Sequence, residues 1–451
     1  MQLSPPPGFA RHLGRSLPRY TSYPTALAFE QSDESRARRW AGSLQGEPLS
    51  VYVHVPFCQS LCWYCGCHTS VPNGYSRIAA YVDDLEREVE LWADALGGHG
   101  GAAFVHFGGG SPNALDPGDF VRLAARLRAA FGFRGGAEIA VELDPRRLDE
   151  PFLAGLAEAG VTRASLGVQT FDPLVQARIN RVQPLDQVAR AVALLRGHGV
   201  KGVNFDLMYG LPGQDPASVG ESARFAAALR PDRVSVFGYA HVPWFKKHQK
   251  MIRQEDLAGP AGRWAQAEAA DAALVMEGYR RVGIDHYALA GDTLIKAARA
   301  GALRRNFQGY TTDSAPILVP LGASAIGRFP GGYIQNARAV NTWAKAVRAG
   351  ALAIERGLTL TTEDRLRARV IERLMCDLKA DVGGICEAEG FAADRLDEAV
   401  AIAALLQADA LCRVEHRRIV IPEGARRLAR VVAAAFDTAI PAGEQRHAKA
   451  V

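Results

Sequence analysis

The chain has no apolar run approaching the ~18 residues that a membrane-spanning helix requires. Residues 1–24 contain scattered arginines and three consecutive prolines, but they lack the apolar core of a signal peptide. Clustered Lys/Arg tracts with interleaved aromatic residues are also missing, which argues against a nucleic-acid partner. The mild net charge of +5 suits an anionic small substrate and equally an ordinary basic surface. We therefore expect a cytoplasmic protein that binds neither membranes nor nucleic acids.

Cysteine is scarce as well, with 7 residues in a chain of 451. In a reducing compartment these cysteines are not expected to form disulfides. Cys376, Cys386 and Cys412 are scattered through the C-terminal part, where buried cysteine commonly serves as a small apolar residue. The other four all lie within residues 58–67. Such crowding is usually explained by metal binding.

From about residue 49 onward, short β-branched segments alternate with amphipathic helical segments. The predicted strands are 51–55, 103–107, 138–142, 163–168, 203–208 and 233–237, and the predicted helices are 75–96, 117–130, 149–159, 185–197 and 216–229. Repeated strand–helix alternation predicts an α/β fold with a parallel sheet, and six such units favour a partial (β/α)6 barrel. A doubly wound open sheet is the alternative that periodicity leaves open.

The composition changes near residue 358, after which the chain is mostly helical, with a predicted strand pair at 411–414 and 418–421. We therefore divide the chain into three parts. Residues 1–48 form an N-terminal segment that contributes to the active site, 49–357 form the partial barrel, and 358–451 form a smaller helical domain. In barrels of this kind the functional residues lie in the loops after the strands.

The cysteine cluster directly follows the first predicted strand and has the spacing Cys58-x3-Cys62-x2-Cys65. Three thiolates on one short loop can bind three irons of a [4Fe–4S] cluster and leave the fourth iron open to a small molecule. A zinc site completed by Cys67, His54 or His68 is the alternative. Structural zinc, however, usually draws its ligands from two separated pairs.

Other polar and flexible residues also fall at the ends of predicted strands. The Gly-Gly-Gly-Ser-Pro sequence at 108–112 follows the second strand, and glycine lets the backbone approach a ligand closely. Glu142 ends the third strand, Gln169 ends the fourth, and Asp206 lies within the fifth. These side chains could hold ribose hydroxyls or an amino group, or each could be a surface or capping residue. Their joint placement favours a binding role.

The cysteine spacing, with the aromatic Tyr64 before the third cysteine, resembles the signature of the radical S-adenosylmethionine superfamily. That resemblance implies a partial βα barrel in which Cys58, Cys62 and Cys65 bind a [4Fe–4S] cluster. It further implies that S-adenosylmethionine chelates the open iron through its amino and carboxylate groups.

Longer segments narrow the resemblance to the oxygen-independent coproporphyrinogen III oxidases. The similar segments are 20–26 (Tyr-Thr-Ser-Tyr-Pro-Thr-Ala), the Cys-Gly-Cys ending at Cys67, 167–169, 180–181, 235–241 and 305–312 (Arg-Asn-Phe-Gln-Gly-Tyr-Thr-Thr). The resemblance runs from about residue 18 to the end of the chain. Phe107, Ser111 and Arg304 depart from the common family pattern of Trp, Thr and His. Only Arg304 bears on how the substrate segment is interpreted.

The resemblance implies two bound S-adenosylmethionine molecules. The first is implied to contact the cluster and four residues: Tyr52, Gly109, Glu142 and Ile326. The second is implied to be held by Tyr64, Gly110, Ser111, Gln169, Arg181, Asp206 and Ala240. Arg181 fits this role physically, because a guanidinium can pair with a carboxylate through two hydrogen bonds. Cys67 is not required as an iron ligand and is left with a structural or auxiliary role.

The implied reaction is the oxidative decarboxylation of two propionates of coproporphyrinogen III to vinyl groups, which gives protoporphyrinogen IX for haem biosynthesis. An unidentified donor would supply the electron that forms a 5′-deoxyadenosyl radical, and this radical would abstract hydrogen from each propionate. Loss of carbon dioxide and of one electron, to an unidentified terminal acceptor, would then leave the vinyl group. We expect a monomer. The alternatives are a haem chaperone of the same superfamily and a zinc-stabilised binding module. Chaperone relatives usually lack Cys67 and the segments at 20–26 and 306–312 that this chain contains.

Overall fold

The computed structural model describes residues 4–439. Its central feature is a run of parallel strands that pair in the order in which they occur in the sequence. These strands are β2 (Leu49–Val55), β3 (Ala102–Gly109), β4 (Phe133–Leu143), β5 (Arg163–Gln169), β6 (Gly202–Tyr209) and β7 (Arg233–Gly238). All six predicted strands are therefore confirmed, with ends that differ by a few residues.

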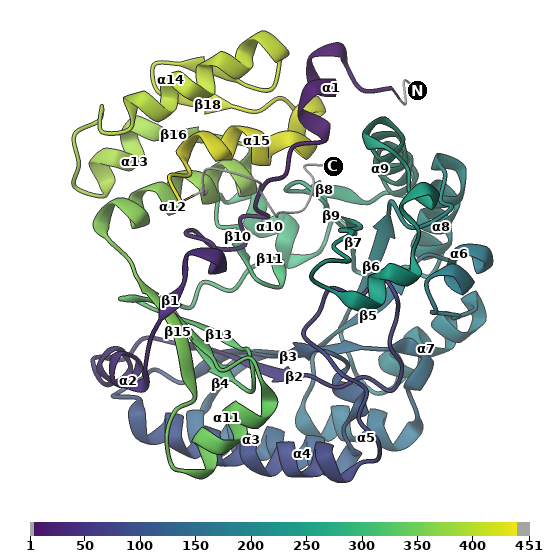
Figure 1. Ribbon diagram of the computed structural model, residues 1–451, viewed down its shortest axis with the longest axis vertical. Helices are drawn as coiled ribbons and strands as arrows, with labels where there is room; N and C mark the ends of the chain where they lie inside the picture. Colours follow the sequence, from purple (N-terminus) through teal and green to yellow (C-terminus); the bar gives the residue numbers. More distant parts are fainter. Residues whose placement is uncertain (1–3, 440–451) are drawn as a thin grey trace.

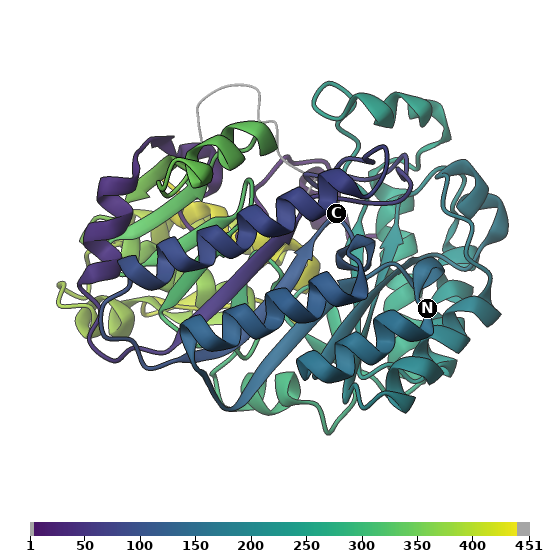
Figure 2. The same ribbon diagram turned by 90° about the horizontal axis from the view of Figure 1, so that it is seen from below.

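Helices connect the strands and cover the outer face of the sheet (Figures 1 and 2). They are α3 (Ser76–Ala95), α4 (Pro117–Phe131), α5 (Glu150–Ala159), α6 (Pro173–Arg178), α7 (Leu185–Gly197), α8 (Pro216–Ala228) and α9 (Pro260–Met276). Local sequence signals define their ends. For example, Asp215 and Ser218 form a capping box at the start of α8, and Gly160 ends α5 in the left-handed conformation.

The strand order excludes the doubly wound alternative. A doubly wound sheet reverses its strand order at a switch point, which places helices on both faces. Here β2 to β7 follow one another without reversal, so right-handed crossovers put the connecting helices on a single face. The other face is left to line the interior of a partial barrel.

The two faces of the strands differ in polarity because successive side chains point in opposite directions. Apolar residues such as Ile139, Val141, Leu166 and Phe205 are buried in the hydrophobic core. The alternate positions carry polar residues and line a cavity, which is described below. The core therefore lies between sheet and helices, whereas the inner face of the sheet is free to form a binding site.

Additional strands extend the sheet beyond both ends of the parallel run. On one side β12 (Ile317–Leu321) is parallel to β2, and β13 (Ile326–Phe329), β14 (Gly332–Asn336), β15 (Ile354–Thr359) and β1 (Glu30–Gln31) continue antiparallel. On the other side β9 (His286–Ala288) and β8 (Arg280–Val282) add an antiparallel edge. The edge strands β1 and β8 are not paired with each other, so the barrel stays open.

The C-terminal region is mostly helical, as expected. Its elements are α12 (Thr362–Asp377), β16 (Lys379–Asp381), α13 (Val382–Ala388), α14 (Asp397–Leu405), β17 (Arg413–Glu415), β18 (Arg418–Val420) and α15 (Ala429–Ala433). The predicted strand pair corresponds to β17 and β18, and β16 joins it as a third strand. Sequence periodicity missed β16 because it is short and largely polar.

The N-terminal segment passes between the barrel and the C-terminal region (Figure 1). In α1 (Pro7–Leu13), Phe9 packs edge-on against Trp264 of α9 with ring centroids 5.7 Å apart, and His12 lies 2.7 Å from Asp409. The remaining helices are α2 (Glu34–Gly42), α10 (Thr293–Arg299) and α11 (Val340–Arg348), and a hairpin is formed by β10 (Arg304–Asn306) and β11 (Gly309–Thr311). Among the described residues, no helix is both long and apolar enough to span a bilayer.

Candidate active site

The cysteine loop begins at the carboxyl end of β2, and its two ends are hydrogen-bonded to each other. The backbone N–H of Cys58 donates to the carbonyl of Ser70 (2.9 Å), and that of Cys65 donates to the carbonyl of Cys62 (3.2 Å). A further bond from Trp63 N to the Ile179 carbonyl (3.0 Å) ties the loop to the residues after α6. Cys62 is buried, and Cys58 and Cys65 are half-buried. The predicted ligands therefore share one loop at the mouth of the barrel.

Cations lie near the sulfurs of Cys62 and Cys65, whereas burial dominates the surroundings of Cys58. The guanidinium of Arg181 lies 3.4 Å from Cys62 Sγ, and that of Arg146 lies 3.8 Å from the same atom. A hydrogen bond from Cys67 lowers the pKa of Cys65 against the effect of burial, and the charges of His248 and Lys246 act in the same direction. Burial raises the pKa of Cys58 to about 11, so binding of metal there has to displace a proton.

The loop fits a cluster better than a single ion. Among residues 4–439, no three His, Cys, Asp or Glu side chains converge on one metal position. Zinc needs four ligands around one atom, whereas a cubane cluster binds each thiolate at a different iron and keeps the sulfurs apart. The imidazole of His54, one of the suggested zinc ligands, is bonded instead to the backbone carbonyl of His68 (3.0 Å).

The glycine-rich segment after β3 packs directly beneath the cysteine loop. Gly110 N donates to the Val55 carbonyl (2.8 Å), and Ser111 N donates to the Phe57 carbonyl (2.8 Å). A Cβ on Gly110 would lie 2.5 Å from that same Phe57 oxygen, so no larger residue fits. Gly109 has a φ of +109°, which favours glycine. Part of the reason for this glycine run is thus close packing against the loop.

Glu142 lies at the end of β4 beside this segment and accepts hydrogen bonds from Gly109 N (3.2 Å) and from His106 Nε2 (3.0 Å). Burial raises the pKa of Glu142, but the bond and charge of His106 and the Gly109 N–H outweigh it and lower that pKa overall. Its carboxylate is therefore charged and can receive an ammonium group. Tyr52 stacks on His106 with ring centroids 5.9 Å apart, and its hydroxyl lies 3.1 Å from His54 Nδ1.

The structure brings Tyr52, Gly109 and Glu142 together, but Ile326 stands apart from them. Ile326 begins β13, which is separated from β2 by β12. Its position at the carboxyl-end loop of β12 still faces the same mouth of the barrel.

The second predicted set divides into two groups. Near the cysteines, the side chains of Gln169 and Arg181 both lie against Gly167. A Cβ atom added to Gly167 would be 2.8 Å from Gln169 Nε2 and 3.1 Å from an Arg181 nitrogen. Arg181 also donates to the Gly167 carbonyl, through Nε at 3.1 Å. Tyr64 precedes Cys65 in the same loop, and its carbonyl accepts from Gln249 (2.9 Å).

Asp206 lies deeper in the barrel, where Ser165 Oγ (2.8 Å) and Asn204 Nδ2 (3.0 Å) donate to its carboxylate. Burial raises the pKa of Asp206. The hydroxyl of Ser111 is bonded to Asn113 Oδ1 (2.7 Å), and Ala240 follows the end of β7.

A cavity of about 440 Å³ occupies the inner face of the barrel. Glu142, His106 and Asp206 line the part of the cavity in which the cofactor is predicted to bind. Arg19, Asp285 and Arg305 line another part, together with residues 306–311 of the β10–β11 hairpin. The cavity thus joins the predicted cofactor residues to a cationic wall.

Sequence reasoning did not assign a role to Arg19, Asp285 or Arg305, although Arg305 opens one of the family segments. Arg305 Nε donates to the Arg19 carbonyl (3.3 Å), and one of the Arg19 terminal nitrogens donates to the Gly238 carbonyl (3.2 Å). A terminal nitrogen of Arg305 lies 3.9 Å from Asp285 and has no hydrogen-bond partner, although the side chain is only 4% exposed. In the sequence, the alternate positions Glu138, Ala140 and Glu142 of one strand already indicated that the inner face of the sheet carries polar residues.

Asp285 is the carboxylate near both guanidinium groups: it lies 3.9 Å from Arg305 and interacts with Arg19 through charge alone. Burial raises the pKa of this carboxyl, but the hydrogen bond with His286 (2.7 Å) and the charges of Arg305 and Arg19 hold that pKa well below its usual range. Burial and the charge of Arg305 lower the pKa of Arg19, although the charge of Asp285 raises it. One carboxylate does not neutralise two guanidinium groups, so this wall carries a net positive charge.

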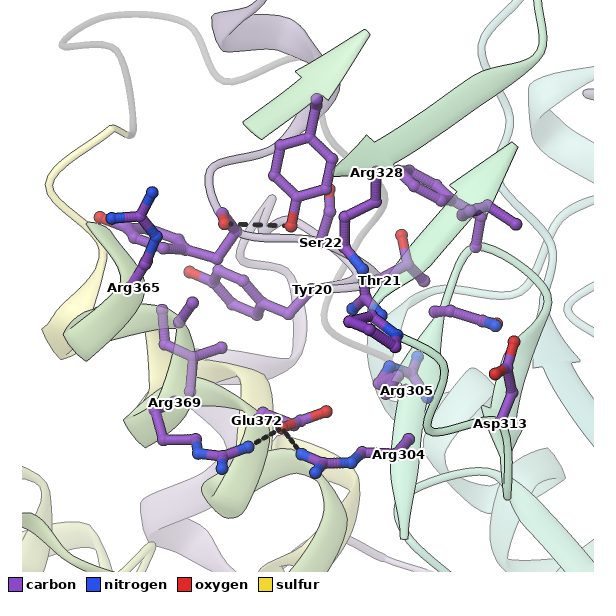
Figure 3. Close-up of a pocket in the computed structure, with 18 of the residues that line it drawn as sticks. Tyr20, Thr21, Ser22, Arg304, Arg305, Asp313, Arg328, Arg365, Arg369 and Glu372 are labelled. Carbon is purple, nitrogen blue, oxygen red and sulfur yellow. Dashed lines mark hydrogen bonds and ion pairs between the residues drawn. The ribbon is translucent and has the colours of Figure 1, made fainter. Parts of the chain in front are cut away.

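A neighbouring cavity of about 410 Å³ lies between residues 20–23, the β10–β11 hairpin and α12 (Figure 3). It shares Thr21, Arg305, Asn306, Phe307 and Asp313 with the barrel cavity. Figure 3 shows Arg304 and Arg369 on either side of Glu372, at 2.8 and 3.4 Å. The β10–β11 hairpin therefore separates two chambers of similar size.

Comparisons with known proteins agree with this geometry. The Radical SAM superfamily model matches residues 52–226. The oxygen-independent coproporphyrinogen III oxidase of Bradyrhizobium diazoefficiens is 46% identical over 437 residues, covering 96% of this chain and 97% of that relative. The enzyme of the same name from Paracoccus denitrificans is 42% identical over 93% of this chain and 94% of its own length.

A solved structure extends the similarity to three dimensions. The coproporphyrinogen III oxidase of Escherichia coli, described as a radical SAM enzyme, superposes with a TM-score of 0.89 at 36% identity. It covers 93% of this chain and 97% of its own. The predicted α/β partial-barrel fold is confirmed, and the haem-chaperone and zinc-module alternatives are not favoured. The chain belongs to the oxygen-independent coproporphyrinogen III oxidases of the radical SAM superfamily.

Proposed function

We propose that this protein converts two propionates of coproporphyrinogen III to vinyl groups without oxygen, with residues of the barrel cavity holding both cofactor and substrate. The reaction belongs to haem biosynthesis and yields protoporphyrinogen IX. When bound, the [4Fe–4S] cluster and S-adenosylmethionine supply the radical that removes hydrogen from the propionate. The protein binds and orients these groups and keeps water away from them.

Cys58, Cys62 and Cys65 are the proposed cluster ligands. The charges of Arg146 and Arg181 near Cys62 Sγ support this assignment, since they offset the negative charge of bound thiolates. The Cys67 N–H lies 3.4 Å from Cys65 Sγ, so we assign Cys67 a supporting contact to a ligand sulfur and no iron.

One S-adenosylmethionine is proposed to lie against Tyr52, Gly109, Glu142 and Ile326. The charged carboxylate of Glu142 is suited to the amino group of that molecule. A second molecule is proposed to use Tyr64, Gly110, Ser111, Gln169, Arg181, Asp206 and Ala240. The spread of these residues over two groups in the barrel supports an extended ligand rather than a compact one.

One observation carries the substrate assignment: the barrel cavity runs from Glu142 to a wall that contains Arg19, Arg305 and a single aspartate, Asp285. We assign Arg19 and Arg305 to a propionate carboxylate of coproporphyrinogen III. A guanidinium presents several N–H groups in a plane and matches a carboxylate in both charge and shape. The unpartnered nitrogen of Arg305 provides a donor that is already desolvated.

The chemistry of decarboxylation decides which propionate this is. Loss of carbon dioxide removes the negative charge of the carboxylate, so a strong ion pair would stabilise the starting state more than the transition state. Coproporphyrinogen III carries more propionates than the two that react. Arg19 and Arg305 are therefore assigned to a propionate that the product keeps, and they act mainly on substrate affinity.

The experiment that tests the function is anaerobic reconstitution of the cluster, followed by reduction in the presence of S-adenosylmethionine and coproporphyrinogen III. We expect formation of 5′-deoxyadenosine and protoporphyrinogen IX. A cluster-loaded protein that forms neither product would refute the proposal. Two equivalents of S-adenosylmethionine bound per chain in equilibrium dialysis would support the two-molecule assignment, and one equivalent would contradict it.

The protein's partners and location also remain predictions. A separate protein is proposed to supply the electron, and the chain is proposed to act as a monomer in the cytoplasm. Light scattering after size exclusion tests the monomer, and fractionation of cells tests the location.

A further inference from the structure

The segment between β7 and α9 exposes large apolar side chains beside a group of lysines. We refer to residues 242–252 as the 242–252 loop. Trp244 is 63% exposed, Phe245 is 70% exposed and Met251 is 58% exposed. Exposed aromatic residues of this size are uncommon on a surface that contacts only water, and aromatic residues and methionine are enriched at protein interfaces.

The loop is positively charged. It contains Lys246, Lys247 and Lys250 and has no Asp or Glu. Lys247 and Lys250 are exposed. The next cation along the chain, Arg253, is already paired with Glu255 (2.9 Å) and Asp256 (3.0 Å). The exposed charges of Lys247 and Lys250 are the ones that a partner can contact.

This loop is joined directly to the cysteine loop. Lys246 Nζ donates to the Cys67 carbonyl (2.8 Å), and His248 Nε2 donates to the Cys65 carbonyl (2.7 Å). A third bond runs from Gln249 to the Tyr64 carbonyl (2.9 Å). Figure 2 shows the segment between β7 and α9 projecting at the same edge of the molecule as the loop after β2. The tip of the cysteine loop, residues 66–68, is itself exposed here.

We propose that the 242–252 loop is the docking surface for the protein that reduces the cluster, a small acidic one-electron carrier. This inference rests on the proposed function. Electron transfer requires the two redox centres to approach closely, and this loop is the exposed apolar surface bonded to the carbonyl of a proposed ligand, Cys65. Lysines around exposed aromatic residues would attract an acidic partner and then bury apolar area against it.

The step at this surface is a single electron transfer. The reduced carrier loses one electron, and the oxidised cluster gains it. No proton or group needs to pass between the two proteins.

An anionic membrane is the other surface that lysines and exposed aromatic residues could contact. The three hydrogen bonds to the cysteine loop favour the electron carrier, because they have no evident purpose in membrane attachment. The two possibilities are separated by the experiment below.

The test uses the cluster-loaded protein and compares two reductants, flavodoxin hydroquinone and dithionite. The variant is Lys247→Glu with Lys250→Glu, since neither residue belongs to the site. The control is Lys201→Glu, which reverses an exposed charge just before β6, at the opposite ends of the strands. Stopped-flow absorbance follows reduction of the cluster.

For the double variant we expect at least about a 10-fold fall in the second-order rate with flavodoxin, because charge steering commonly contributes 10-fold or more to association. The salt dependence of this rate should become weaker. Reduction by dithionite and the control variant should be unaffected. Trp244→Ser should slow reduction by flavodoxin without changing the salt dependence.

Three results would overturn the inference. The flavodoxin rate could be unchanged in both variants, or dithionite reduction could fall in parallel, which would place the effect on the cluster itself. Alternatively, binding to phosphatidylglycerol vesicles could depend on Lys247 and Lys250 while the flavodoxin rate does not. If the dithionite-reduced wild-type protein forms no product, the proposed function fails instead of the docking surface.

Discussion

The cationic wall of the barrel cavity allows the effect of a substitution on substrate affinity to be estimated in advance. In Arg305→Gln the side chain keeps hydrogen-bonding groups but loses its charge and its planar fork of donors. A hydrogen bond to a charged group contributes about 1.5–3 kcal/mol. This range corresponds to a loss of affinity of about 10- to 150-fold. Arg305 is only 4% side-chain exposed, so solvent screening reduces this figure little.

The assay is a fluorescence titration with coproporphyrin III, the stable oxidised form of the substrate, together with steady-state kinetics on coproporphyrinogen III. We expect the dissociation constant and KM to rise by the factor above, while kcat changes by less than about 3-fold. Arg19→Gln should show the same pattern. If Arg305→Gln does not fold, Arg19→Gln decides the question, because within residues 4–439 the Arg19 guanidinium makes one hydrogen bond, to the Gly238 carbonyl.

Two controls make the result specific. Arg122→Gln removes an exposed arginine on α4 that pairs with Asp83, Glu86 and Asp119, and it should leave substrate affinity unchanged. Arg328→Gln removes a cation from the neighbouring cavity. If Arg328→Gln weakens binding and both Arg305→Gln and Arg19→Gln do not, the carboxylate lies in the other chamber and the assignment is refuted. An equal fall in kcat and kcat/KM for Arg305→Gln would also refute the argument that the bound propionate does not react.

Three further predictions follow from other parts of the molecule. Cys62→Ser should abolish the brown absorbance of the reconstituted cluster while circular dichroism stays native; retained iron and sulfide would contradict the ligand assignment. Glu142→Gln should weaken binding of S-adenosylmethionine by about 10-fold or more, measured by equilibrium dialysis, because a charge-assisted hydrogen bond is lost; unchanged binding would remove Glu142 from that site. Asp271→Asn should lower the free energy of unfolding by about 3–5 kcal/mol, because it leaves Arg426 and Arg427 without their shared buried carboxylate. Burial raises the pKa of Asp271, but Arg281, Arg427, Tyr287 and Arg426 together lower it to about 2 from 3.8. That lowered pKa stabilises the wild-type fold by about 2 kcal/mol above pH ~4, and this contribution is lost as the pH falls toward 2. The difference between the urea midpoints of wild type and variant should therefore become smaller there.

Much of the fold could be predicted from local sequence. The six parallel strands alternate with helices, several of which start with an Asp N-cap and a proline in the first turn, and these signals need only neighbouring residues. The strands β1 and β12–β15 escaped prediction, because they are short and pair with partners far away in the sequence. For example, Glu30 pairs with Gly357, so part of the N-terminal segment and the end of the predicted barrel belong to one sheet.

The candidate site, like the fold, was predictable from the sequence only in part. Spacing alone placed Cys58, Cys62 and Cys65 on one loop after a strand, since three residues of one short turn cannot move far apart. The cationic wall was decided by tertiary structure. Arg19, Asp285 and Arg305 come from an N-terminal segment, a loop before β9 and a hairpin strand, and no local pattern connects them. Charges interact through space rather than along the chain, so only the folded barrel could show that two guanidinium groups lie near one carboxylate.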